Sequence, residues 1–453
     1  MATKNLLTYN AKVSSVEEAY FSPVAVVPPY YDIPLSSLYC FLSKVDPWED
    51  DNDPPTPTQD QKYIKQVFKN IFVVKNITSN DISPVIKRVD WTTGVQYDYY
   101  RDDVDMFAVD GSGNPVYNFY VRNQYDQVFK CLWNAGVPST VEPYFEPGSF
   151  GTNNIYLGAD GYKWKFMYTI DTGTKVKFMN ADWLPVPVGA NTPNPLTSSA
   201  GAGNIDVINV IDGGSGYDPA NAIITLTVTG DGKNAAGTVQ VTDGVITDVT
   251  VTNTGTNYTY ANVAITSSIG SGVIAYANTS PIGGHSYDPI SELGTSHVMF
   301  AVEFNGAESG IIPTDITYHQ LGIVITPTTS ELSPAPANGT IYKVSTDLVV
   351  APGFGVFIND EVVYQGEVTN PTFTGMVLSF DPASNVIRLI NTSGSLITNA
   401  PVHGKTSITT RTLLTYSTPN FTTFSGYMSY IENRSGIVRS ADGIEQFKFV
   451  LGY

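Results

Sequence analysis

Histidines are the first side chains of this sequence that could do chemistry. His285, His297, His319 and His403 include no HxH or HxxxH pair, the close spacings at which one strand or helix presents two metal ligands. We therefore expect satisfied or surface imidazoles, and no metal site.

An acidic stretch beside aromatic residues is the second candidate. Asp98–Asp105 supplies carboxylates next to Tyr97, Tyr99 and Tyr100, and glycosidases use a pair of carboxylates. The chain has 42 acidic residues, so such clusters arise by chance, and Arg101 lies within this one. Solvated acids are the favoured interpretation, and a polysaccharide-cleaving enzyme is kept as a rival.

Two loops are considered for calcium and phosphate binding, and both lack the residue pattern that such binding requires. Asp46–Thr58 is acidic, but it contains four prolines and no glycine, whereas a calcium loop needs ordered carboxylates and a glycine at its bend. Gly213–Gly216 leads into Tyr-Asp-Pro and not into a helix, which indicates a turn and not a phosphate cradle. We predict no catalytic residue, no cofactor site and no metal site, and expect that the chain is not an enzyme.

Tyrosines could bind sugars instead, because sugar rings stack on aromatic faces. The candidates are Tyr217, Tyr258, Tyr260 and Tyr276. The fixed repeat positions of Tyr217 and Tyr258 favour packing inside a β-module. A carbohydrate-binding tail adhesin or a polysaccharide depolymerase remains the alternative function.

Composition indicates many short strands. The chain has 39 Gly, 29 Pro and 28 Tyr, with only 15% charged residues. A net charge of -18 argues against nucleic acid as a partner. No apolar run approaches the roughly 20 residues of a membrane helix, and no signal peptide is visible, so we expect no membrane partner and assembly in a cytoplasm. Cys40 and Cys131 are predicted to be buried thiols.

The clearest helix is predicted at residues 58–70. Thr58 and Gln61 fit a capping box, and an apolar stripe follows at helical spacing. Strands are predicted at Leu38–Lys44, Val128–Trp133 and Gly161–Ile170, with a Pro-punctuated arm at 1–35.

A linker and an internal repeat divide the chain. Residues 193–203 are rich in Pro, Ser, Ala and Gly. After them, Tyr217 recurs as Tyr258 within a longer repeat of 41 residues, and Asp243-Gly244 fits a hairpin turn between the copies. The sequence divides into five segments: 1–196 (core), 197–281 (inserted duplicated β-module), 282–328 (core), 329–410 (second inserted β-module) and 411–453 (C-terminal core strands). Short strands are predicted within 329–410 at Ile341–Val344, Gly355–Ile358, Glu361–Gln365, Gly375–Phe380 and Asn385–Leu389. The predicted fold class is mostly β, a multi-domain β-sandwich-type core with a few short helices.

Five short patterns stand in order along the chain: Asp46-Pro-Trp48 with Pro54-Pro55, Ile86–Trp91 with Tyr97-Asp-Tyr99, Gly161–Trp164 with Tyr168, Tyr318–Pro327, and Ser425–Arg434. Together they resemble the baseplate wedge subunit of T-even-type contractile-tailed bacteriophages, the wedge protein of the eighth gene in the T-even scheme. The resemblance covers roughly residues 36–190, 285–327 and 420–453 and leaves the two insertions unmatched.

The resemblance implies a structural virion protein with no cofactor. Such subunits form homodimers and join other baseplate wedge proteins in the viral tail, in the plate that changes shape when the tail contracts. It implies assembly in the host cytoplasm. On this basis Trp48 and Trp91 are expected to be largely buried near the helix.

Overall fold

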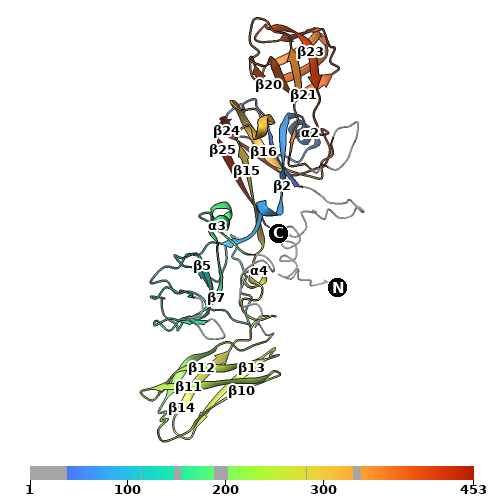
Figure 1. Ribbon diagram of the computed structural model, residues 1–453. Coiled ribbons are helices and arrows are strands. Elements are labelled where there is room, and N and C mark those ends of the chain that lie inside the picture. Colours follow the sequence, from blue (N-terminus) through green and yellow to red (C-terminus); the bar gives the residue numbers. More distant parts are fainter. Residues whose placement is uncertain are drawn as a thin grey trace, which may run out of the picture. The chain divides into compact units, whose positions relative to one another are not determined.

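The computed structural model describes residues 38–112, 114–146, 155–187, 203–281, 283–329, 337 and 339–452. Strands dominate these residues (Figure 1), and they are joined by three short α-helices, α2 (Gln61–Asn70), α3 (Thr172–Phe178) and α4 (Pro289–Glu292), and by 3₁₀ turns at Ser79–Asp81 and Glu308–Gly310. The mostly β, multi-domain fold class is confirmed. No helix in this part of the chain is long and apolar enough to cross a membrane. The arm predicted at 1–35 and all but the last residue of the predicted linker lie outside the described residues.

Two compact units divide the chain, and both are discontinuous in sequence. Unit 1 comprises the described residues of Ser83–Met299 and Val450–Tyr453, and unit 2 those of Glu18–Ile82 and Phe300–Phe449. Among the described residues the chain changes unit at three places, within β3 (Ile82–Lys87), β15 (His297–Asn305) and β25 (Ile444–Gly452). Three of the five segments predicted from the sequence, 1–196, 282–328 and 411–453, contain residues of both units.

The core of unit 2 is a five-stranded antiparallel sheet assembled from distant parts of the chain. In its central strand every residue is buried, and Leu38 stands opposite both Ile77 and Ile325. An apolar run without a polar face is typical of such a fully buried strand. The strand order is β17 (Ile341–Lys343), β2 (Ile71–Ile77), β1 (Leu38–Ser43), β16 (Ile316–Ile325) and β24 (Tyr427–Arg439).

Helix α2 covers part of this core, but it begins later than predicted. Asp60 is the N-cap, and its carboxylate accepts the Tyr63 amide at 2.9 Å. The Thr58 hydroxyl instead donates to the Asp60 carboxylate, so Thr58 lies before the helix and the predicted capping box is wrong. The predicted apolar stripe is confirmed, since Val67 and Phe68 are buried in the core of unit 2.

A closed six-stranded barrel also belongs to unit 2 (Figure 1). The side chains of Leu348, Val363, Ile387 and Leu413 fill it and have 0% exposure. In barrel order the strands are β18 (Thr346–Val350), β21 (Val386–Gly394), β20 (Asn370–Asp381), β19 (Val362–Glu367), β22 (Pro401–Gly404) and β23 (Thr410–Ser417).

The strand predicted at Gly355–Ile358 is wrong. This segment is a loop whose carbonyl groups are bound by side chains and not by a neighbouring strand. Arg411 donates to the Gly355 carbonyl at 2.7 Å, and the Thr409 hydroxyl donates to the Val356 carbonyl at 3.1 Å.

Unit 1 contains a four-stranded antiparallel sheet with an aromatic core. Trp164 has 0% exposure, stacks on Tyr162 with ring centroids 5.3 Å apart, and meets the Tyr97 ring at 5.6 Å. The strand order is β4 (Tyr120–Arg122), β5 (Gln127–Trp133), β7 (Lys163–Thr169) and β6 (Ile155–Leu157), and β3 (Ile82–Lys87) pairs separately with β8 (Trp183–Pro185).

The duplicated module of unit 1 folds with equivalent strands against each other (Figure 1). Thr225 stands opposite its repeat counterpart Thr266, and Ile208 stands opposite its counterpart Val249. β11 of the first copy pairs with β12 of the second, and β14 of the second pairs with β9 of the first. The strands of each copy therefore pair with strands of the other copy, about an approximate local two-fold axis. Neither copy buries its apolar face alone. The strands are β9 (Ile208–Ser215), β10 (Ile224–Gly230), β11 (Lys233–Thr242), β12 (Val245–Thr256), β13 (Ala261–Ser267) and β14 (Ser271–Ala277).

The expectation for the two tryptophans is wrong in part. Trp48 and Trp91 are half-buried and not largely buried. Trp91 belongs to unit 1, whereas helix α2 and Trp48 belong to unit 2. The stretch between them crosses from unit 2 to unit 1, so the two indoles belong to different units.

Candidate functional site

Two histidines lie in ordinary packing positions. The His297 ring is 4.6 Å from the Trp183 ring between centroids, and His403 Nδ1 is 3.0 Å from the Thr410 hydroxyl. Among the described residues, no group of three or more His, Cys, Asp or Glu side chains could hold a metal ion.

A third histidine, His319, connects the acidic loop 46–58 to the core sheet of unit 2. Its Nε2 is 3.2 Å from the Asp51 carboxylate and its Nδ1 is 3.2 Å from the Lys44 carbonyl oxygen. Asp51 also accepts the Trp48 amide at 2.7 Å, and this bond, with the contribution of His319, holds the pKa of Asp51 below its usual range. The acidic loop is therefore braced through its own carboxylate.

The acids considered for glycoside cleavage hold local structure. Asp102 accepts the Tyr276 hydroxyl at 2.6 Å and the Thr279 amide at 2.8 Å. Asp98 accepts the amide of Asn118 at 2.8 Å. Both carboxylates thus tie loops of unit 1 together, which favours a bracing role over general acid or base chemistry.

The four tyrosines considered for sugar binding have different environments. Tyr217 and Tyr258 are each only 4% exposed, so their predicted packing inside the β-module is confirmed. The Tyr276 hydroxyl is bonded to Asp102. Tyr260 is 55% exposed and is the member of this set that could offer a ring face to a sugar.

A buried charged cluster in unit 1 was missed from the sequence. Lys130 Nζ lies 3.1 Å from Glu292 Oε2 and 3.2 Å from His285 Nδ1. The ammonium also lies 4.0 Å from the centre of the Tyr100 ring, in a cation–π contact. The side chains of Lys130, Glu292 and His285 are all at most 2% exposed. The signal was a single lysine inside the apolar run Val128–Trp133.

Burial and neighbouring charges together shift the pKa values of this cluster. Burial alone would raise the pKa of Glu292, but the Lys130 ammonium and the neighbouring His285 together outweigh burial, and the pKa lies below its ordinary value. Burial lowers the pKa of His285, and the nearby ammonium lowers it further. The cluster therefore holds a Glu292–Lys130 ion pair beside a neutral imidazole.

The neutral imidazole makes a pH-dependent prediction. Below pH 6.5 an unfolded chain protonates His285, whereas the buried ring resists the proton, so stability falls as pH falls. Between pH 6.5 and 5.5 this site accounts for at most about 1.4 kcal/mol of the free energy of unfolding. Urea unfolding at pH 7.5 and 5.5 should show a smaller pH dependence in His285→Gln than in the wild type. Identical pH dependences would contradict the assignment of a neutral buried imidazole.

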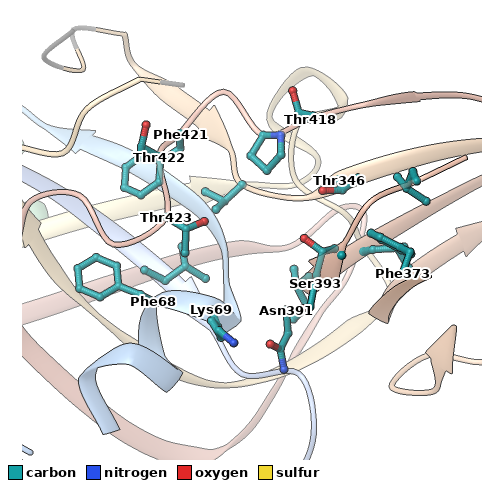
Figure 2. A pocket seen from close by; sticks show the side chains of 18 of the residues that line it. Phe68, Lys69, Thr346, Phe373, Asn391, Ser393, Thr418, Phe421, Thr422 and Thr423 are labelled. Carbon is teal, nitrogen blue, oxygen red and sulfur yellow. The ribbon is translucent and has the colours of Figure 1, made fainter. Parts of the chain in front are cut away.

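A pocket of about 570 Å³ lies in unit 2 between α2, β21 and the loop that follows β23. Figure 2 shows Phe68 and Lys69 of α2, Asn391 and Ser393 of β21, and Thr423 of the loop among the side chains that line it. Its volume is within the roughly 300–1,000 Å³ typical of small-molecule sites.

Comparison of the sequence with models of protein families and with curated proteins gives no match.

Proposed function

We propose that this chain is a structural virion protein of a contractile-tailed phage, a subunit of the tail baseplate wedge. In this proposal it forms a homodimer, links neighbouring wedge proteins during assembly in the host cytoplasm, and takes part in the rearrangement that accompanies contraction. The observation that carries the proposal is that the five patterns of the resemblance pack against one another within the two units.

In unit 2 three of the patterns meet, although hundreds of residues separate them. The indole Nε1 of Trp48 donates to the Arg434 carbonyl at 2.8 Å. His319, from the fourth pattern, contacts Asp51 just after the first. The strands that carry the fourth and fifth patterns, β16 and β24, pair with each other along most of their length.

In unit 1 the remaining two patterns share one aromatic core. Tyr97 and Trp164 contact each other edge to face, and the Tyr162 hydroxyl accepts the Tyr97 amide at 3.3 Å. The half-buried Trp91 packs against this core, and its Nε1 donates to the Ser139 hydroxyl at 3.0 Å.

These contacts support a structural role, in which the residues of the five patterns maintain the shape of the protein. Their aromatic rings and amides form packing contacts and long-range hydrogen bonds, and the acids weighed for catalysis brace loops. A subunit that transmits force between neighbours needs such fixed cores. The proposal explains why the residues of the five patterns contact one another within each unit.

Mass spectrometry of purified virions tests the proposal. The chain should be found in intact particles and in isolated tails, at a constant ratio to the other baseplate proteins. Its absence from purified tails would overturn the proposal. Light scattering on the purified chain should give twice the 49.0 kDa monomer mass if the homodimer forms without its partners.

A further inference from the structure

The pocket between α2, β21 and the loop after β23 has a lining that differs in charge from the rest of the chain. Eight of its lining residues are Ser, Thr or Asn, and the one charged side chain is Lys69. The chain as a whole has 42 acidic and 24 basic residues. A lining with a cation and no carboxylate is therefore favourable to an anion in a protein that otherwise repels anions.

A β-bulge directs part of this lining. In the pairing of β20 with β21, Thr374 stands opposite Ser393 and Met376 opposite Ile390, so β21 has one residue more than its partner. Asn391, within this bulge, has a φ of 49°, a left-handed conformation that is uncommon outside glycine. Bulges often redirect side chains next to binding sites.

Three polar side chains of the lining are available to hydrogen-bond a ligand. The side chains of Lys69, Asn391 and Ser393 form no hydrogen bond or ion pair with the other described residues. They supply an ammonium, an amide and a hydroxyl around the hollow shown in Figure 2. Such groups match a ligand that carries both a negative charge and hydroxyl groups.

Aromatic rings complete the lining. Phe424 is 49% exposed and Tyr416 is 41% exposed, and both border the pocket. Phe424 is held by an edge contact with Phe68, with ring centroids 6.1 Å apart. A half-exposed ring presents a negative face to the C–H groups of a sugar.

We propose that this pocket binds an acidic saccharide, with the sugar carboxylate on Lys69, the hydroxyl groups on Asn391 and Ser393, and a sugar ring against Phe424. One cation is too few for a nucleic acid, whose binding requires several Lys or Arg contacts. A wholly apolar ligand would leave the hydroxyl and amide groups without partners. The site is independent of whether the chain is a baseplate subunit.

Calorimetric titration of the full chain tests this site. The probes are trigalacturonate, 3′-sialyllactose and a hyaluronan tetrasaccharide, with maltotriose as the uncharged sugar and inorganic phosphate as the simple anion. At least one acidic saccharide should bind, and added salt should weaken the binding. Lys69→Gln should weaken it about tenfold, because a hydrogen bond to a charged group is lost.

Matched variants separate binding from folding. Lys62→Gln removes the same charge from an exposed position of the same helix and should leave the affinity unchanged. Ser393→Ala should weaken binding severalfold without changing the charge. The proposal is overturned if none of the acidic saccharides binds, if phosphate or maltotriose binds as tightly as they do, or if Lys69→Gln and Lys62→Gln have equal effects.

Discussion

Replacement of Lys130 by methionine should lower the free energy of unfolding by about 3–5 kcal/mol, because it leaves the Glu292 carboxylate buried without its cation. Methionine preserves most of the volume of lysine, so a cavity contributes little to the loss. Urea unfolding followed by tryptophan fluorescence measures the effect at pH 7.5, where Glu292 is ionised.

A double variant separates charge from packing. Lys130→Met with Glu292→Gln removes both charges and should recover a large part of the lost stability, since the uncompensated buried carboxylate is gone. Lys62→Met, at an exposed position, should remain within about 0.5 kcal/mol of the wild type. A wild-type stability for Lys130→Met would contradict the buried ion pair.

Replacement of Trp164 by alanine should cost about 3–5 kcal/mol, because Trp164 is fully buried between Tyr162 and Tyr97. Trp91→Ala should cost less, since this indole is half-buried and loses one hydrogen bond to Ser139. The melting temperatures of the two variants show which substitution costs more stability.

The variant Trp164→Phe is a second control, which tests the contribution of the indole nitrogen. Trp164 Nε1 is buried and has no hydrogen-bond partner among the described residues. Trp164→Phe therefore keeps most of the apolar contact and removes an unsatisfied donor, and it should be much less harmful than Trp164→Ala. Equal melting temperatures for Trp164→Ala and Trp91→Ala would contradict the aromatic core of unit 1.

Local patterns predicted much of the fold. The Asp243-Gly244 turn has φ values of 53° and 77°, both positive as a type I′ hairpin requires. The strand at Val128–Trp133 and the apolar stripe on α2 were also predicted. These features depend on residues close in sequence, which a period or a turn signature can reveal.

Long-range pairings could not be predicted in the same way. Lys130, Lys163 and Lys165 lie on strands where alternation with apolar residues favours a solvated face, yet all three are buried. The carboxylate that pairs with Lys163 is Asp248, at 2.7 Å, in the distant β12. A buried lysine depends on a partner that only the folded chain brings near.

The candidate sites likewise divide into local features, which could be predicted, and long-range ones, which could not. The sequence correctly indicated that Tyr217 and Tyr258 pack within the repeat. It gave no sign of the pocket beside α2, because the bulge at Asn391 and the placement of Lys69 arise from three segments far apart in the chain.

Cryo-electron microscopy of the intact tail tests whether this chain is a baseplate wedge subunit. We expect density for this chain in each wedge of the baseplate, with the β1–β16–β24 sheet and the six-stranded barrel recognisable in it and a second copy in contact with the first. A tail map in which every baseplate density is accounted for by other chains would contradict it.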